Sequence, residues 1–314
     1  MSRTLRRWGR LVCGLVGVVV LLSATMSAPS VIPPLVAAEL DPVGLPPQAA
    51  PVVAATTQAT RAVRRLDQIS ERSHVAVSVF DEKTGKTFEH GSDRFETASL
   101  VKVHLVALMS WQAAQNGTRL TAPQRRDARL MLTRSDNDAA LRTYFALGSG
   151  PGIERGLAAA YGRPRISVGD LGAWGHSVTR PGAVVALLGD VLDPEAGDTY
   201  ALLRRSMARV VPDQRWGISV LADDGSTVET KVGWFQDPDG WIANSSGRVV
   251  VDGSPVLISV MSDRNPTLEA GIATIESVAR LTGDVVRARR IETAAVTSPS
   301  RQGCFVAVPS IAAC

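Results

Sequence analysis

The chain has 314 residues, of which 45% are hydrophobic and 20% charged, and its formal net charge is +4. Four arginines among the first ten residues have no acidic counterpart there, so the rest of the chain carries 30 basic and 30 acidic residues. A near-neutral chain with scattered arginines excludes a nucleic-acid-binding protein with a basic surface, and its apolar fraction is typical of a globular fold.

Residues 1–28 have the pattern of a secretory signal peptide, in which arginines precede an apolar run and small residues follow it. The apolar run, residues 11–22, is about a dozen residues long, whereas a membrane-spanning helix needs about 20. We therefore expect a secreted or cell-envelope protein with no stable membrane span after signal removal. The Arg6-Arg7 pair leaves the general and the twin-arginine export routes both open.

The remaining chain divides into three parts by composition. Residues 29–56 are rich in Pro and Ala and predict an extended linker, residues 57–290 predict one folded domain, and residues 291–314 predict a C-terminal tail. Cys304 and Cys314 lie in this tail, where a disulfide bond and two free thiols are alternative hypotheses. We expect a monomer.

Hydrophobic periodicity predicts the elements of the domain in chain order. A helix over 57–72 precedes a hairpin of strands 74–80 and 87–89, and a long helix over 99–114 follows. A helical block comes next, at 123–133, 138–147, 152–161, 180–192 and 199–210. Strands at 216–223, 228–234, 241–251 and 255–261 and a helix at 267–282 close the domain. This order predicts an α+β fold, an antiparallel sheet flanked by terminal helices with an inserted all-helical lobe over about 118–212.

Ser99 and Lys102 lie at the start of the long predicted helix. A spacing of three residues places both side chains on one helix face, as a nucleophile and its base require. An isolated S-x-x-K is usually a helix cap, but the apolar neighbours Val101, Val103 and Leu105 would bury Lys102, which is costly without a functional partner.

Two further polar segments complete the set. Ser135, Asp136 and Asn137 lie between two predicted helices, and Lys231 precedes Val232, Gly233 and Trp234 on a predicted strand. The alternative interpretation treats Ser99 and Ser135 as helix caps and Lys231 as a surface charge. It requires three coincidences in the right order.

The three segments, in this order, resemble the S-x-x-K, S-D-N and K-T-G motifs of the penicillin-recognising active-site-serine enzymes, above all the class A β-lactamases. The resemblance covers about residues 57–282 and implies the β-lactamase/transpeptidase-like fold. It also implies that Ser99 is acylated, Lys102 accepts its proton and Ser135 relays a proton. Substrate binding would fall to Asn137, Lys231, Gly233 and Trp234, with the backbone N–H groups of Ser99 and Trp234 as the oxyanion hole.

The sequence departs from this family in two places. The glutamate that hydrolyses the acyl-enzyme in class A β-lactamases has no counterpart: the segment 165–181 is short, with Asp170 and His176 as the only candidate bases. Val232 replaces the hydroxyl residue that binds the substrate carboxylate. These departures predict a secreted serine hydrolase with slow deacylation, acting on β-lactam or D-alanyl-peptide type substrates.

The alternative function is a cell-envelope binding protein that keeps the fold with little turnover. We expect no metal, because His74, His90 and His104 fall into no metal-ligand spacing. We also expect no cofactor, because no Gly-rich phosphate loop follows a strand. Gly148–Gly152 is interpreted as an interhelical turn.

Overall fold

The computed structural model describes residues 49–170 and 173–297. Its α-helices are α1 (Ala49–Ser70), α2 (Val101–Gln115), α3 (Ala122–Arg134), α4 (Asn137–Ala146), α5 (Ser149–Tyr161), α6 (Pro181–Leu192), α7 (Ala201–Met207) and α8 (Leu268–Thr297). The strands are β1 (His74–Asp81), β2 (Lys86–His90), β3 (Phe95–Glu96), β4 (Val178–Thr179), β5 (Glu229–Asp237), β6 (Gly240–Val251) and β7 (Ser254–Asn265). Short 3-10 helices are η1 (Ala98–Leu100), η2 (Trp174–His176), η3 (Pro194–Tyr200), η4 (Pro212–Gln214) and η5 (Ile218–Leu221).

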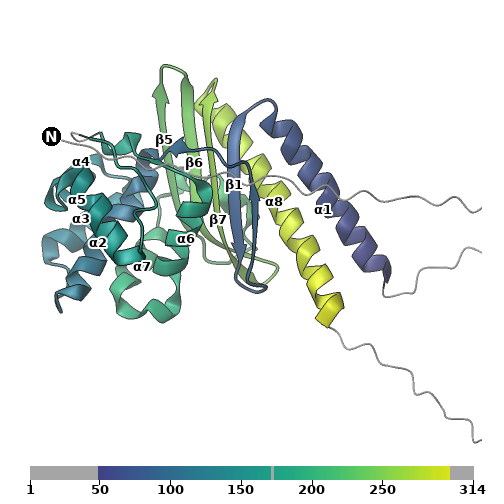
Figure 1. The fold of residues 1–314 in the computed structure, drawn as a ribbon, viewed down its shortest axis with the longest axis horizontal. Coiled ribbons are helices and arrows are strands. Elements are labelled where there is room, and N and C mark those ends of the chain that lie inside the picture. Colours follow the sequence, from purple (N-terminus) through teal and green to yellow (C-terminus); the bar gives the residue numbers. More distant parts are fainter. Residues whose placement is uncertain (1–48, 171–172, 298–314) are drawn as a thin grey trace, which may run out of the picture. The chain divides into compact units, whose positions relative to one another are not determined.

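The main sheet is antiparallel, with the strand order β2-β1-β7-β6-β5. β1 and β2 precede the helical block in the chain, and β5 to β7 follow it, so the sheet joins segments that are far apart in sequence (Figure 1). The predicted α+β fold, with terminal helices on the sheet and an inserted helical lobe, is confirmed.

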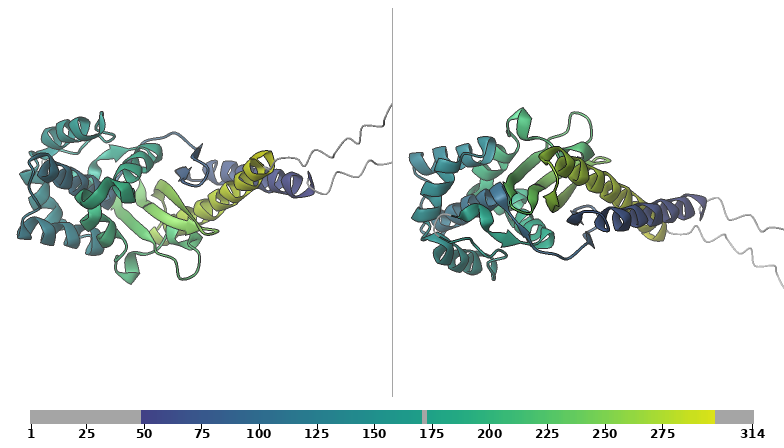
Figure 2. Two further views of the ribbon diagram at one scale, coloured as in Figure 1. Left: turned by 90° about the horizontal axis from the view of Figure 1, so that it is seen from below. Right: turned by 90° about the horizontal axis from the view of Figure 1, so that it is seen from above.

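Alternation along the strands divides the interior into two cores. On β7, Val256, Ile258 and Val260 belong to the core on the α8 side, whereas Leu257 and Met261 belong to the core on the side of α6 and the helical lobe. This is the period of two that a strand buried on both faces requires. Figure 1 shows α6 and α8 on opposite sides of the sheet, and the yellow α8 can be followed in the further views (Figure 2).

α2 runs through the centre of the helical lobe. Its first ten residues, 101–110, are all buried, as expected of a helix that is apolar on all sides. Lys102 and His104 are therefore enclosed by protein, as the apolar neighbours of Lys102 predicted.

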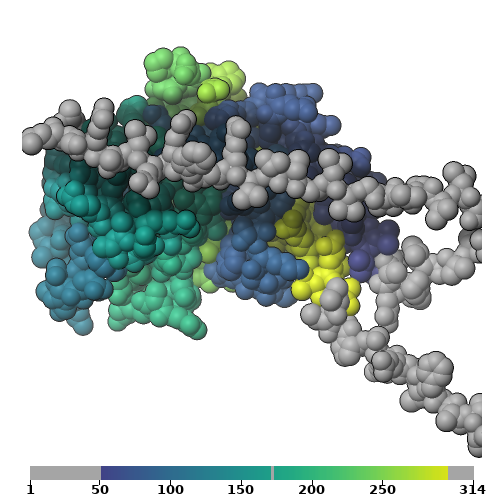
Figure 3. Space-filling model, viewed as in Figure 1, coloured from purple at the N-terminus to yellow at the C-terminus, as the bar shows by residue number. Residues whose placement is uncertain are grey.

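The terminal helices are longer than the sequence suggested. α1 begins inside the expected linker 29–56, and α8 continues past residue 282 into the expected tail 291–314. The two helices pack along each other (Figures 1 and 3), and Thr56 Oγ1 donates to Glu292 Oε1 at 2.8 Å. Mutual packing stabilises turns that helical propensity alone leaves marginal.

One predicted strand is wrong. The segment 216–223 contains η5, and Gly217, with φ of +83°, turns the chain there. The Ile218 N–H donates to Ser245 Oγ at 3.1 Å, so this segment lies on β6 through a side chain instead of joining the sheet. Its alternating apolar residues fill the core from a 3-10 turn.

Smaller differences concern the helical block. The expected turn Gly148–Gly152 is mostly helical because α5 begins at Ser149, and the expected helix 199–210 divides into η3 and α7. The signal segment 1–28, Cys304 and Cys314 lie outside the described residues. Within the described part of the chain, no helix combines the length and hydropathy of a membrane span.

Candidate active site

Ser99 lies on a strained turn at the entrance to α2. It belongs to η1, so α2 begins two residues later than predicted, and the preceding Ala98 has φ of +47°, a region unfavourable for a residue with a Cβ. The buried Asn244 of β6 donates to the Glu96 and Thr97 carbonyls at 2.9 and 3.2 Å. This amide therefore holds the turn that presents Ser99, a contribution that sequence analysis missed.

Lys102 is fully buried one turn after Ser99. Its Nζ lies within hydrogen-bond distance of Ser99 Oγ at 2.9 Å, Ser135 Oγ at 3.1 Å, Asn137 Oδ1 at 2.7 Å and the Ser135 carbonyl. Burial lowers the pKa of Lys102 to about 7, and the Asp136 carboxylate opposes this shift. A sizeable fraction of the amine is therefore neutral at neutral pH.

The neutral amine fits these partners well. A carbonyl and a carboxamide oxygen can only accept hydrogen bonds, so the two N–H groups of a neutral lysine are used by Ser135 O and Asn137 Oδ1. The lone pair is then free to accept a proton from Ser99, 2.9 Å away. This arrangement orients a general base toward a nucleophile.

The S-D-N segment connects α3 to α4, as predicted. Ser135 ends α3 in the left-handed region, with φ of +59°, which points both its carbonyl and its hydroxyl at Lys102. Asp136 caps α4 by accepting from the Ala139 N–H at 2.7 Å. The segment is thus both a helix cap and a source of polar contacts to Lys102.

Lys231 is fully buried, so its interpretation as a surface charge is wrong. Its Nζ donates to Ser135 Oγ at 3.0 Å and to the Val232 carbonyl at 2.7 Å. Burial, together with the nearby Lys102, lowers the pKa of Lys231 well below its ordinary value. The amine contacts Ser135, and this enclosed position does not favour direct contact with a substrate carboxylate.

Gly233 allows β5 to pass closely over the nucleophile turn. A Cβ at this position would lie 2.7 Å from the Thr97 carbonyl oxygen and 2.8 Å from the Ser99 nitrogen, which no side chain tolerates. Val232, with its side chain fully buried, supplies no hydroxyl. The backbone of β5 therefore passes close beside Ser99, next to the residue Trp234 whose N–H the resemblance assigns to an oxyanion hole.

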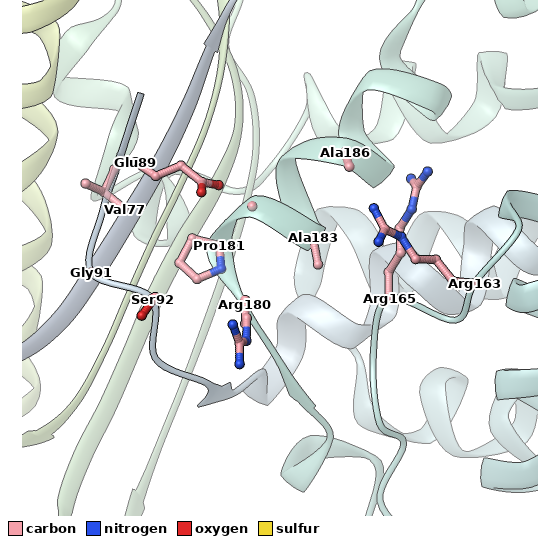
Figure 4. A pocket seen from close by; sticks show the side chains of 11 residues that line it. Val77, Glu89, Gly91, Ser92, Arg163, Arg165, Arg180, Pro181, Ala183 and Ala186 are labelled. Carbon is pink, nitrogen blue, oxygen red and sulfur yellow. The ribbon is translucent and has the colours of Figure 1, made fainter. Parts of the chain in front are cut away.

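A cavity of about 260 Å³ opens at Ser99. It is lined by Ser99, Arg134, Ser135, Asn137, Gln214 and Trp234. Arg134 and Gln214 were not identified from the sequence, although Arg134 directly precedes the S-D-N segment. A separate cavity of about 420 Å³ beside α6, with Glu89, Arg163, Arg165 and Arg180 around it, does not include Ser99 (Figure 4).

Neither candidate hydrolytic base lines the cavity at Ser99. Asp170 faces α5, where a Cβ on Gly150 would lie 3.5 Å from its Oδ1. His176 Nδ1 lies 3.2 Å from both carboxylate oxygens of Glu96, and its ring packs against Phe235 at 4.8 Å between centroids.

Trp174, from the same segment 165–181, lies next to Lys102; this side of the amine is called the loop side. The centre of its indole ring lies 4.8 Å from Lys102 Nζ, a cation–π distance when the amine is protonated. No pattern of residues in the short segment 165–181 singled out this tryptophan. Among the described residues, no group of His, Cys, Asp or Glu side chains is arranged to hold a metal ion.

Comparison with known proteins finds the fold but no sequence relative. No protein-family model matches the chain, and no curated protein matches it either. The structure is similar to a β-lactamase from Xanthomonas campestris, with a TM-score of 0.63 and 16% identity over 73% of this chain and 98% of that one. A β-lactamase from Burkholderia vietnamiensis gives 0.62 and 17% over 79% and 99%.

An ancestral class A β-lactamase gives a TM-score of 0.60, with 18% identity over 70% of this chain and 98% of the ancestral chain. The chain therefore has the fold of the class A β-lactamases over about three quarters of its length, as the sequence resemblance implied. Structural similarity at identities this low establishes the fold alone, so the chemistry has to be argued from the residues of the site.

Proposed function

We propose that this protein is a serine acyl-transfer enzyme that cleaves amide or ester bonds through an acyl-enzyme on Ser99, with β-lactams or D-alanyl peptides as candidate substrates. The observation that carries the proposal is the contact of 2.9 Å between Ser99 Oγ and Lys102 Nζ, an amine with a pKa of about 7. A hydroxyl nucleophile needs such a base, and burial of a lysine without a task would only destabilise the fold.

In the proposed acylation step, Ser99 Oγ attacks the substrate carbonyl carbon while its proton passes to Lys102 Nζ. The C–N or C–O bond to the leaving group then breaks, and the leaving atom takes a proton through Ser135 Oγ, which lies within hydrogen-bond distance of Lys102 and Lys231. The product is an ester on Ser99, and Lys102 returns to its neutral form. The backbone N–H groups of Ser99 and Trp234 would stabilise the oxyanion.

The position of Arg134 favours a substrate that carries a carboxylate. β-Lactams and D-alanyl peptides both carry a carboxylate, and Arg134 is among the residues that line the cavity at Ser99. Lys231 is enclosed and already bonded, and Val232 has no hydroxyl, so the usual partners are not available. A guanidinium binds carboxylates through paired charge-assisted hydrogen bonds.

Slow deacylation and export belong to the same proposal. Asp170 and His176 lie outside the cavity at Ser99, which supports slow attack by water on the ester.

Export by the segment 1–28 is tested by N-terminal sequencing of protein recovered from the cell envelope or medium, where an unprocessed Met1 would contradict it.

A second candidate function is a cell-envelope binding protein with little turnover. Val232 in place of a hydroxyl residue favours it. The lowered pKa of the buried Lys102 opposes it, because binding alone does not need a base.

Intact-mass spectrometry after addition of a fluorescent penicillin, and separately of p-nitrophenyl acetate, tests the proposal. We expect an adduct on wild type that is lost in Ser99→Ala. An ester adduct without a penicillin adduct would restrict the enzyme to other acyl donors. No adduct with either probe would contradict acyl transfer and favour the binding protein.

A further inference from the structure

Hydrogen bonds around Ser177 hold the backbone of Trp174 from both sides of the site. Ser177 Oγ donates to the Trp174 carbonyl at 2.6 Å, and the Thr97 N–H donates to the Ser177 carbonyl at 2.7 Å. The Gly169 N–H donates to Ser177 Oγ at 3.1 Å, and Tyr144 Oη donates to the Gly169 carbonyl at 2.8 Å. The backbone of Trp174 is therefore linked through Ser177 both to the turn that precedes Ser99 and, by way of Gly169, to the buried Tyr144 of the helical lobe.

The indole of Trp174 is one of the groups that surround the Lys102 amine. Its ring centre lies 4.8 Å from Lys102 Nζ, and the side chain packs on the core of the helical lobe. The other contacts of the amine are four oxygen atoms of Ser99, Ser135 and Asn137. With all these neighbours in place the lysine side chain is fully buried.

Hydrolysis of a Ser99 ester needs more than these groups supply. A water molecule must reach the ester carbonyl and give a proton to a base, after which Ser99 Oγ leaves and takes a proton back. Among the described residues, no carboxylate forms a hydrogen bond with Ser99 or Lys102, and the neighbouring Leu171 and Gly172 carry no basic or acidic side chain. Lys102 is thus the base that water must approach, and the indole lies against it.

We propose that Trp174 is a positioning residue that keeps hydrolytic water away from Lys102 and so prolongs the life of the acyl ester on Ser99. This inference rests on the proposed function, because it presupposes an acyl-enzyme. Slow deacylation is then a consequence of the indole ring of Trp174, which lies on the loop side of Lys102. It also predicts that the ester survives long enough for a nucleophile other than water to collect the acyl group.

The ring has a second effect on the same amine. Once Lys102 has taken the Ser99 proton, the π-face attracts the ammonium ion. Burial by the indole acts in the opposite direction, because it disfavours the charged form, and burial is the largest influence on the pKa of Lys102. Removal of the indole should therefore move the Lys102 pKa upward, toward that of a hydrated lysine.

The experiment follows the acetyl ester that p-nitrophenyl acetate leaves on Ser99. Wild type, Trp174→Ala, Trp174→Phe and Trp111→Ala are acetylated, freed from reagent and sampled by intact-mass spectrometry over hours. Trp111 is a matched control, because it is a partly buried tryptophan near the far end of α2 that packs on the same core. The pH dependence of acetylation is measured for the same four proteins.

At a pH above the acetylation midpoints of both proteins, where Lys102 is neutral in each, we expect Trp174→Ala to lose the acetyl group about tenfold faster than wild type or more, since water gains access to a base. Trp174→Phe, which keeps an aromatic ring, should lose the acetyl group at a rate within about threefold of wild type. Trp111→Ala should lose it at the wild-type rate. The midpoint of the acetylation rate should move to higher pH in Trp174→Ala but not in Trp111→Ala, the variant that measures the effect of a general loosening of the core.

An unchanged ester lifetime in folded Trp174→Ala, or equal acceleration in Trp111→Ala, would overturn the inference while leaving acyl transfer by Ser99 intact. If the alanine variant does not fold, Trp174→Leu takes its place and must still release the acetyl group faster than wild type. Absence of any acetyl adduct on wild type would instead refute the proposed function, and with it this inference.

Discussion

Besides the turn that carries Ser99, two segments contact Lys102, and they differ in chemistry. The α3–α4 connection offers it oxygen atoms, from Ser135 and Asn137, whereas the η2 segment offers the apolar face of Trp174. The first group supports proton transfer to and from the amine, and the second excludes the solvent that would finish a hydrolysis. The contrast is the one that the proposed function requires, in which an acyl ester forms more readily than it is hydrolysed.

Lys102→Met should have the largest effect, because it removes the amine that the oxygen atoms of Ser135 and Asn137 contact. A neutral side chain of similar length cannot accept the Ser99 proton, so we expect acylation by p-nitrophenyl acetate to fall by about 10³-fold. Stopped-flow release of p-nitrophenolate measures it, with Lys83→Met on the exposed β1–β2 turn as the control. A reduction of less than about tenfold would show that another group is the base.

Gly233→Ala tests the strand that closes the site. The new methyl group would meet the Thr97 carbonyl oxygen at 2.7 Å and the Ser99 nitrogen at 2.8 Å, so β5 must move away from the nucleophile. We expect a loss of about 1–3 kcal/mol in the free energy of unfolding and about a 10²-fold slower acylation.

Gly175→Ala is the control for this substitution, because a Cβ there meets nothing within 4 Å. Urea denaturation and the acylation rate measure both variants. Equal behaviour of the two would contradict the close approach of β5 to Ser99.

The pH dependence of acylation sharpens the assignment of the base. With a Lys102 pKa of about 7, the neutral amine disappears as the pH falls through that value. The acylation rate should therefore be nearly constant above pH 8 and decrease about tenfold for each unit below pH 7. A midpoint near the ordinary lysine pKa would show that Lys102 is not the group that titrates.

Arg134→Gln tests what the cavity recognises. Loss of the guanidinium should reduce acylation by a carboxylate-bearing penicillin about tenfold and leave acylation by the neutral p-nitrophenyl acetate unchanged. Arg129→Gln, on an outward-facing position of the same helix, is the matched control. An equal loss with both substrates would indicate a structural role for Arg134.

The smallest effects should come from the two residues that the sequence offered as hydrolytic bases. Asp170→Asn and His176→Gln should each leave the lifetime of the acyl ester within about twofold of wild type, because neither side chain lines the cavity at Ser99. A markedly longer lifetime in either variant would identify that residue as the base and weaken the contrast between the two segments.

Local features of the site were predictable from neighbouring residues. The apolar run around Lys102 predicted its burial, and the helix-breaking composition of Ser135–Asn137 predicted a connection between helices, because burial and capping depend on residues a few positions away. The strand prediction at 216–223 was wrong for the complementary reason. An alternating apolar pattern does not reveal that Gly217 turns the chain there.

By itself, the sequence determined the α+β class, the three polar motifs and the buried state of the lysine after the nucleophile. Only the tertiary structure decided that Lys102 and Lys231 meet at the Ser135 hydroxyl, that Arg134 lines the cavity and that the Trp174 ring lies against Lys102. These facts depend on how the sheet joins segments from both ends of the domain. Such long-range placement follows from the packing of the whole chain, whereas periodicity and capping are set within a few residues.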